Sequence, residues 1–592
     1  MQGQESHAKP HGGGWFNRKL KIFILFLGLI SFSNLIFSNN TFALFTPTLS
    51  ASVDNAAASV NGNQVINSTN KTTEIPLNLT VNTNNKTGYT ATLSSETENT
   101  ALTNTTSTAG AKINSISSTG PLGGFSNNTW GYKFGASTNY APIPALSAPA
   151  QILKTTGKTN GNESNQLSIG MKLTDNLESG NYTNKLILSF VSNPYTPIAI
   201  MTEGPDFNAK LKALESETNK IEHFKKSTVA PAASMNAVNI DDDESDYEIK
   251  LWLDPIDKTA YYYTEPEKVY LNTDSSKMFL SEYGEQKIKN ILELDLSNFD
   301  TSQVTYMYGM FYGMSNLTTL NLFNFDTSKV ADMRYMFAGM TNLTSLNLSN
   351  FDTSQVMYMG GMFAGMSNLT TLNLSNFNTS KVTNMGFMFQ GMSSLTTLDL
   401  SNFDTSQVTY VRGMFASTRS LTALNLSHFD TSKVTNMETM FAGMSSLTTL
   451  DLSNFDTSKV MDMSYMFNYV SSLTTLNLSN FNTLKVTNMR YMFAGMTNLT
   501  SLNLSNFDTS KVKNMSYIFS LVAEDMPKDK LEKIYVNNDF DTSQLISFSN
   551  MFTNRKKLRG GNGSYLADPS TADKTWLRVD RPGVQGYFTR KP

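Results

Sequence analysis

A repeat of fixed length constrains the fold of this 592-residue chain more than any other feature. Each repeat opens with an L-x-x-L-x-L pattern, as in residues 343–348, and continues with Val356, Met359, Met362 and Phe363 at intervals of three or four. A period of about 20–29 residues with this opening is typical of leucine-rich repeats. The period is 26 residues, because phenylalanine recurs as Phe299, Phe325, Phe351, Phe377, Phe403, Phe429, Phe455, Phe481 and Phe507.

The two halves of the repeat predict one short strand and one short helix per unit over residues 291–552. One unit cannot bury its leucine and methionine faces alone, so we expect the units to stack around a shared core filled by the methionines. The predicted fold class of this region is an α/β leucine-rich repeat solenoid. Residues 248–290, with a hairpin around Trp252, and residues 553–592 would cap its two open edges.

The N-terminus has the features of an export signal. Arg18, Lys19 and Lys21 precede an apolar run from Ile22 to Ile30, and small residues follow near Ala43. We therefore predict a secretory signal peptide over residues 1–43. The alternative is an uncleaved membrane anchor, since the apolar run is just long enough to span a bilayer. Either outcome places the rest of the chain outside the cytoplasm, at the cell surface or secreted.

Residues 44–200 are rich in Thr, Ser, Asn and Gly, with short alternating apolar segments such as residues 76–81. This pattern predicts an all-β sandwich, with Trp130 in its core and Tyr132 at the rim. Residues 201–247 are expected to form a linker with one short amphipathic helix around Phe207 and Leu211. The predicted chain is therefore multidomain, with the β-sandwich followed by the repeats.

Composition argues against most classes of enzyme. The chain has no cysteine and only 4 histidines, which are scattered in the sequence. Its net charge of −3 provides no basic field for nucleic acid. A column of aspartates, one in most repeats, allows either a calcium ladder or acceptors for turn N–H groups. We favour the turn role because Asn378 and Asn482 replace aspartate in two repeats. We expect no catalytic residues, cofactor or metal site.

The run Leu-Ser-Asn-Phe-Asp-Thr-Ser-Lys-Val-Thr-Asn-Met, followed by Met-Phe-x-Gly, resembles the BspA-like leucine-rich repeat surface proteins of bacteria. The segments around Trp252 and around residues 560–563 and 586–589 resemble that family's flanks, so the resemblance covers residues 248–592. It implies a noncatalytic adhesin that contacts host extracellular-matrix or surface proteins, or the surfaces of other microbes. The alternative is a structural spacer or surface-coat component without a specific ligand. Many members carry Cys where this chain has Met340 and Met366, so redox behaviour tied to that Cys is not expected.

Two faces of the repeat array are candidates for binding. The residues between the strand leucines, such as Asn373 and Asp399, form a small polar face that suits a periodic glycan or keeps the sheet soluble. The outer face of the expected helices carries Tyr and Arg, which are enriched at interaction hot spots. An alternative is that the tyrosines only shield neighbouring helices. The predicted partner-binding residues are Tyr306, Tyr308, Arg334, Tyr335, Tyr358, Phe387, Tyr410, Arg412, Tyr465, Arg490, Tyr491 and Tyr517. The expected partners include no nucleic acid, and a membrane only through an uncleaved N-terminal segment.

Overall fold

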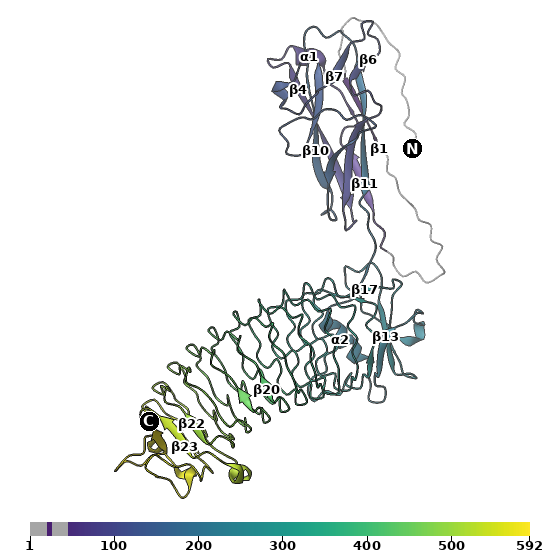
Figure 1. Cartoon of the computed structure of the whole chain (residues 1–592). Coiled ribbons are helices and arrows are strands. Elements are labelled where there is room, and N and C mark those ends of the chain that lie inside the picture. The colour runs from purple at the N-terminus through teal and green to yellow at the C-terminus, as the bar shows by residue number, and fades with distance from the viewer. Residues whose placement is uncertain (1–19, 27–44) are drawn as a thin grey trace. The chain divides into compact units, whose positions relative to one another are not determined.

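The computed structural model describes residues 45–592 and the backbone of residues 20–26. The chain forms two compact units, Met1–Pro197 and Ile198–Pro592 (Figure 1). The predicted signal peptide lies outside the described residues except for strand β1 (Leu20–Phe26), which pairs in parallel with β11 (Tyr182–Ser192). In the part of the chain that the structure describes, no helix is long and apolar enough to cross a membrane. Export stays a prediction.

The first unit is built almost entirely of β-strands. Alternating burial is clearest in β4 (Thr72–Thr83), where Leu77, Leu79 and Val81 are buried while the residues between them are more exposed. Trp130 is fully buried and donates its indole N–H to the carbonyl of Thr100 at 2.9 Å. The remaining elements are β2 (Leu49–Val53), β3 (Ala57–Ala58), α1 (Gly62–Ile66), β4 (Thr72–Thr83), β5 (Tyr89–Ser95), β6 (Leu102–Asn104), β7 (Lys112–Ser115), η1 (Leu122–Gly124), β8 (Thr129–Phe134), β9 (Ala150–Lys154) and β10 (Glu163–Lys172).

These strands are hydrogen-bonded into one 11-stranded sheet, whereas the predicted sandwich would have two separate sheets. The order along the main path is β2-β4-β10-β8-β7-β6-β11-β1-β3, and β5 and β9 branch from β11. The link between the two groups of strands is β7, which pairs with β6 on one side and with β8 on the other. The pattern of alternating residues predicts strands but not this connection.

The second unit begins with elements that precede the first repeat. Helix α2 (Gly204–Ala213) lies in the segment expected to be a linker, and its Phe207 and Leu211 are fully buried in the core of this unit. The expected hairpin is present, with Trp252 opposite Tyr261. The elements here are β12 (Ala199–Ile200), β13 (His223–Lys226), η2 (Ala233–Met235), β14 (Val238–Asn239), β15 (Lys250–Asp254), β16 (Thr259–Tyr263), β17 (Val269–Tyr270), β18 (Glu293–Leu294) and β19 (Phe299–Asp300). They form a five-stranded sheet and a three-stranded sheet.

No α-helix is present among the described residues 291–552, where the sequence predicts one helix per repeat, so the prediction of an α/β solenoid is wrong. The chain is β-rich, with several separate sheets, and the repeats form stacked 26-residue rungs (Figure 1). Most of each rung consists of turns. The remaining elements are β20 (Ala423–Leu424), β21 (Thr449–Leu450), β22 (Ser501–Asn503), η3 (Ala523–Lys528), β23 (Lys533–Val536), η4 (Pro569–Thr571), η5 (Lys574–Trp576) and β24 (Phe588–Arg590).

Turns replace the expected helix because the backbone N–H groups of this segment do not all bond within it. Some donate to the next rung, and others donate to carbonyls three residues earlier. We call this part of each rung, such as residues 330–340, the turn segment. The N–H groups of Met333, Tyr335 and Phe337 each donate to a carbonyl of the next rung at 3.0 Å. In contrast, the N–H groups of Met336 and Met340 close turns onto carbonyls three residues earlier. Overlapping turns of this length place apolar side chains at helix-like intervals, and this explains the wrong assignment.

The motif Asn-Phe-Asp-Thr joins neighbouring rungs through side chains. Asn350 donates its amide to the carbonyls of Leu322 and Phe325 in the preceding rung, at 2.9 and 2.8 Å. The buried hydroxyl of Thr327 donates to the carbonyl of Asp352 and accepts from its N–H, at 2.8 and 2.9 Å. The asparagine contacts recur at Asn376, Asn402, Asn454, Asn480 and Asn506, and His428 takes the same place in one rung. These repeated contacts between neighbouring rungs, which are partly buried, fix the register of the stack.

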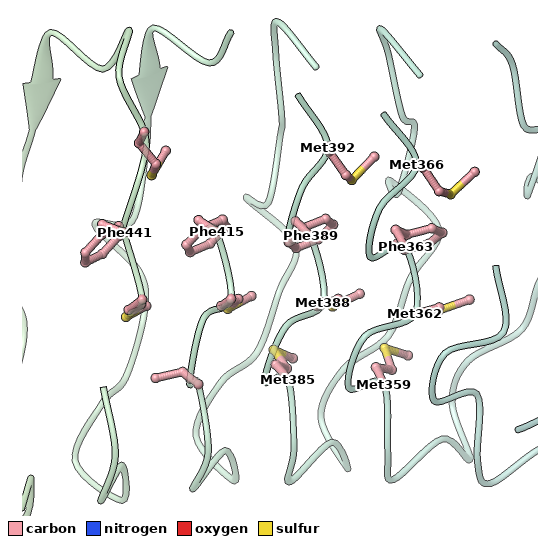
Figure 2. Packing of buried hydrophobic residues seen from close by; sticks show 14 of the residues in the cluster. Met359, Met362, Phe363, Met366, Met385, Met388, Phe389, Met392, Phe415 and Phe441 are labelled. Carbon is pink, nitrogen blue, oxygen red and sulfur yellow. The ribbon is translucent and has the colours of Figure 1, made fainter. Parts of the chain in front are cut away.

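The prediction that methionine fills the core is confirmed. Met359, Met362 and Met366 are fully buried, beside the corresponding methionines of the next rung (Figure 2). Phe363 stacks on the phenylalanines before and after it, at 6.0 Å between ring centroids and nearly parallel. Such stacks continue along the whole array, so each rung buries its aromatic ring against two others.

Both ends of the stack are closed by residues outside the regular rungs. At the first end, the N–H of Gly204 donates to the carbonyl of Asp274, and the Asn208 amide donates to those of Met278 and Leu280. These bonds satisfy carbonyls that would otherwise face an absent rung. At the last end, the ring of Tyr587 packs on the terminal rung, and β24 extends the sheet of β22 and β23.

Candidate binding surface on the turn segments

All twelve predicted partner-binding residues lie in the turn segments. We call this set of twelve residues the turn edge. Five of them, Tyr335, Phe387, Tyr465, Tyr491 and Tyr517, occupy one equivalent position and have φ between 55° and 60°. Bulky side chains rarely adopt this left-handed conformation, which costs on the order of 1–3 kcal/mol. Glycine occupies the same position in other rungs, as Gly309, Gly361 and Gly413. The surrounding ladder of hydrogen bonds holds the aromatic residues in this conformation.

The first group on the turn edge surrounds Arg334. Its guanidinium lies over the rings of Tyr308 and Tyr358, at 5.4 and 5.0 Å from their centroids. The same guanidinium pairs with Asp332 at 2.6 Å, and this contact, against the opposing effect of burial, raises the pKa of Arg334. Tyr335 packs edge-on against Tyr308 at 6.0 Å. The charge of Arg334 is thus already satisfied inside the protein.

The second group surrounds Arg412. Its guanidinium lies 5.4 Å from the centroid of Phe387 and pairs with Glu438 at 2.8 Å. The ring of Phe387 lies over Gly413, where a Cβ would come within 2.6 Å of it. Tyr410 lies over Gly386 in the same way. These aromatic rings fill spaces that glycine leaves on the neighbouring rung, so packing accounts for them.

The third group differs because its tyrosines stack on one another. The centroids of Tyr465 and Tyr491 are 4.7 Å apart, and those of Tyr491 and Tyr517 are 4.5 Å apart at an interplanar angle of 4°. Arg490 lies 5.2 Å from the Tyr491 centroid and is exposed. Among the residues that the structure describes, Arg490 has no carboxylate within ion-pair distance. This group therefore presents a guanidinium that contacts the Tyr491 side chain but has no carboxylate partner among the described residues, beside an ordered aromatic row.

Burial on the turn edge differs from the sequence prediction. The five residues expected to point straight out are half-buried, and burial raises the pKa of both Tyr335 and Tyr491. The left-handed backbone folds their rings back onto adjacent rungs. The flanking Tyr306 and Tyr358 are more exposed, at 51% and 38%. The structure brings most of the predicted residues into three groups, and Tyr306 lies outside them.

Residues 273–372, 340–449 and 443–565 match a family described as "Mycoplasma protein of unknown function, DUF285". The three overlapping matches cover the stacked rungs and leave the first unit outside. The description gives no activity or ligand. No curated protein matches the chain.

Sequence reasoning missed three exposed apolar residues near the turn edge. Met357 and Met461 precede the flanking position and are 42% and 53% exposed. Tyr469 has φ of 57° and lies over Gly495, at a position where most rungs have glycine. A comparison of the rungs would have found Tyr469, because it is the one aromatic residue at a position where most rungs have glycine.

The aspartate column serves as turn acceptors, as predicted. Asp352 accepts the N–H of Ser354 at 2.8 Å, and Asn378 accepts that of Ser380 at 3.1 Å. Hydrogen bonds from the side chain and the backbone N–H of Ser406 lower the pKa of Asp404 below its usual value. Within the described ranges, no group of three or more His, Cys, Asp and Glu side chains is arranged to hold a metal ion.

Proposed function

We propose that the chain is an exported, noncatalytic surface protein that binds partners through the third group of the turn edge. The observation that carries this proposal is the stack of Tyr465, Tyr491 and Tyr517 beside Arg490, which is exposed and has no carboxylate partner in the described part of the chain. Tyrosine and arginine dominate the hot spots of protein interfaces. The resemblance to the BspA-like surface proteins supports host matrix proteins or the surfaces of other microbes as the partners.

The scaffold supports binding because it holds these side chains in place. Tyr465 and Tyr491 each donate a backbone N–H to the next rung, at 2.8 and 3.1 Å. The stacked rings restrict each other's rotation, so little side-chain entropy remains to be lost on binding. A guanidinium without a carboxylate partner matches a carboxylate or another acidic group through two parallel hydrogen bonds. We therefore expect the partner to present an acidic group beside an apolar one.

The polar face between the strand leucines remains the competing site for a glycan. Its rungs form a shallow cavity of about 360 Å³ lined by residues such as Asn373, Thr397 and Asp399. These side chains are small and nearly identical from rung to rung, so they offer no large anchor. The spacer alternative predicts no specific partner for either face.

An adhesion assay on immobilised host matrix proteins separates these alternatives. Tyr465, Tyr491 and Tyr517 are changed together to Thr. Threonine is compatible with this position, because Thr439 occupies it in another rung with φ of 57°. We expect adhesion to be lost while thermal unfolding changes little. The comparison variant replaces Asn373, Asp399 and Asn425 on the polar face with Lys, and we expect it to adhere normally. The opposite pattern would place the site on the polar face, and no adhesion by the unmodified chain would favour the spacer.

A further inference from the structure

A second cavity lies at the start of the polar face, away from the turn edge. Its volume is about 410 Å³, and three successive rungs line it. Glu293 and Asp295 come from the first of these rungs, Asn321 and Phe323 from the second, and Asn347 from the third. The cavity therefore combines two carboxylates, three amides including that of Asn324, and one aromatic ring.

Phe323 breaks the repeat in a way that packing does not explain. The equivalent position is serine in every other rung from Ser297 to Ser505. The Phe323 side chain is 68% exposed, so it contributes little to the core. Its backbone N–H donates to the Asn321 side chain at 3.2 Å, as serine does at this position in the next rung. Folding requires only that backbone contact, and the exposed ring serves no purpose in it.

The side of the cavity formed by the first rung carries negative charge, from Glu293 and Asp295. Asp295 uses one carboxylate oxygen to accept from the N–H and hydroxyl of Ser297, at 3.1 and 2.6 Å, and the other oxygen stays available. Glu293 lies 3.2 Å from the His223 ring. Of the described residues that line the cavity, none is lysine or arginine. Later rungs carry Thr, Ser or Ala in place of Glu293, whereas Asp recurs at the position of Asp295 as Asp399 and Asp451. The pairing of two carboxylates in one rung therefore marks this end of the face.

We propose that this cavity binds an arginine side chain of a basic peptide segment. The planar guanidinium stacks on the face of Phe323 as a cation–π contact. Its N–H groups then reach the free oxygen of Asp295 and the carboxylate of Glu293, where a planar fork fits better than an ammonium ion. The amides of Asn321 and Asn347 accept or donate to the peptide backbone. A neutral glycan would use the ring and the amides but not the charge.

The test uses the full chain and a fluorescently labelled pentapeptide of arginine, with a citrulline pentapeptide as the uncharged probe of the same shape. We expect the arginine probe to bind, more weakly at higher salt, and the citrulline probe not to bind. Phe323→Ser restores the residue of the other rungs, so it preserves the fold. It should weaken arginine binding about fivefold, the equivalent of one exposed cation–π contact. Glu293→Gln with Asp295→Asn should abolish the dependence on salt.

Leu484→Ser is the matched control, because Leu484 is also an exposed apolar residue at a position where the other rungs have serine. It should bind the arginine probe normally, as should the chain with the three tyrosines of the turn edge replaced. Equal binding of the probe to Phe323→Ser and to the unmodified chain would overturn the proposal. So would binding of a neutral trisaccharide that depends on Phe323 when the arginine probe does not bind, since the site would then recognise a glycan.

Discussion

Replacing Arg555 with Met tests how the stack ends. Arg555 is fully buried and pairs with Asp529 at 2.6 Å. Its guanidinium also donates to the carbonyls of Phe493 and Met496, at 3.3 and 3.1 Å, and to that of Phe519. In regular rungs the equivalent carbonyls accept N–H groups three residues further along the chain. One arginine thus supplies donors where the repeat pattern is lost.

The expected cost follows from what Arg555→Met leaves behind. Asp529 would remain buried and charged, with one oxygen that already lacks a partner within the described residues. Removing one member of a buried ion pair costs about 3–5 kcal/mol. Adding Asp529→Asn removes the charge and keeps the acceptor for the N–H of Leu531. We expect the double variant to recover about 2 kcal/mol, because only the carbonyls then lack donors.

Hydrogen exchange measured by mass spectrometry on the full chain shows which rungs are destabilised by Arg555→Met. Protection should fall in peptides from residues 493–536 and stay unchanged in peptides from residues 343–421, because each rung contacts only its neighbours. Unchanged protection in the C-terminal rungs, or no recovery in the double variant, would refute the account of Arg555.

Three further predictions concern the regular rungs. Thr379→Val removes hydrogen bonds of 2.9 and 2.8 Å to the backbone of Asp404, and it should cost about 1–3 kcal/mol in chemical denaturation. Met362→Ala with Phe363→Ala should lower the thermal unfolding temperature strongly, because each core truncation costs about 2–5 kcal/mol. Hydrogen bonds lower the folded-state pKa of Asp404 and Asp456. Their stabilisation is therefore present above the unfolded pKa of about 3.9 and is lost as pH falls through the folded values. Unfolding scans at decreasing pH should show this loss, and replacing both residues with Asn should reduce it.

The sequence predicted much of what depends on period and burial. The 26-residue repeat, the buried methionines, the hairpin at Trp252 and the turn role of the aspartates all appear in the structure. Each of these features follows from the local conformational preferences of the residues or from the tendency of apolar side chains to be buried. The asparagine and threonine ladders were not predicted, because their partners lie 25 to 28 residues away and depend on the register between rungs.

The helix prediction failed because periodicity does not identify the backbone conformation. Turns closed every three residues produce nearly the same spacing of apolar residues as a helix. The turns differ from a helix in containing residues with a left-handed backbone conformation. Glycine at Gly309 and Gly361 was a usable signal, since this position prefers a residue that tolerates positive φ. The change in backbone also altered the candidate site, because aromatic rings expected on an outer helix face fold onto adjacent rungs. Phe323 was detectable from the sequence alone, as the one phenylalanine in a column of serines.

The most direct test of the central claim is the affinity of the chain for purified host matrix proteins. Affinity is measured for the unmodified chain, for Arg490→Gln and for Tyr491→Thr. A hot-spot residue contributes at least about 2 kcal/mol, or roughly a thirtyfold change in affinity. We predict a loss of that size for both variants, with no change when Asn373 is replaced by Lys. Unchanged affinity in both variants, with a loss on replacement of Asn373, would contradict binding through the turn edge.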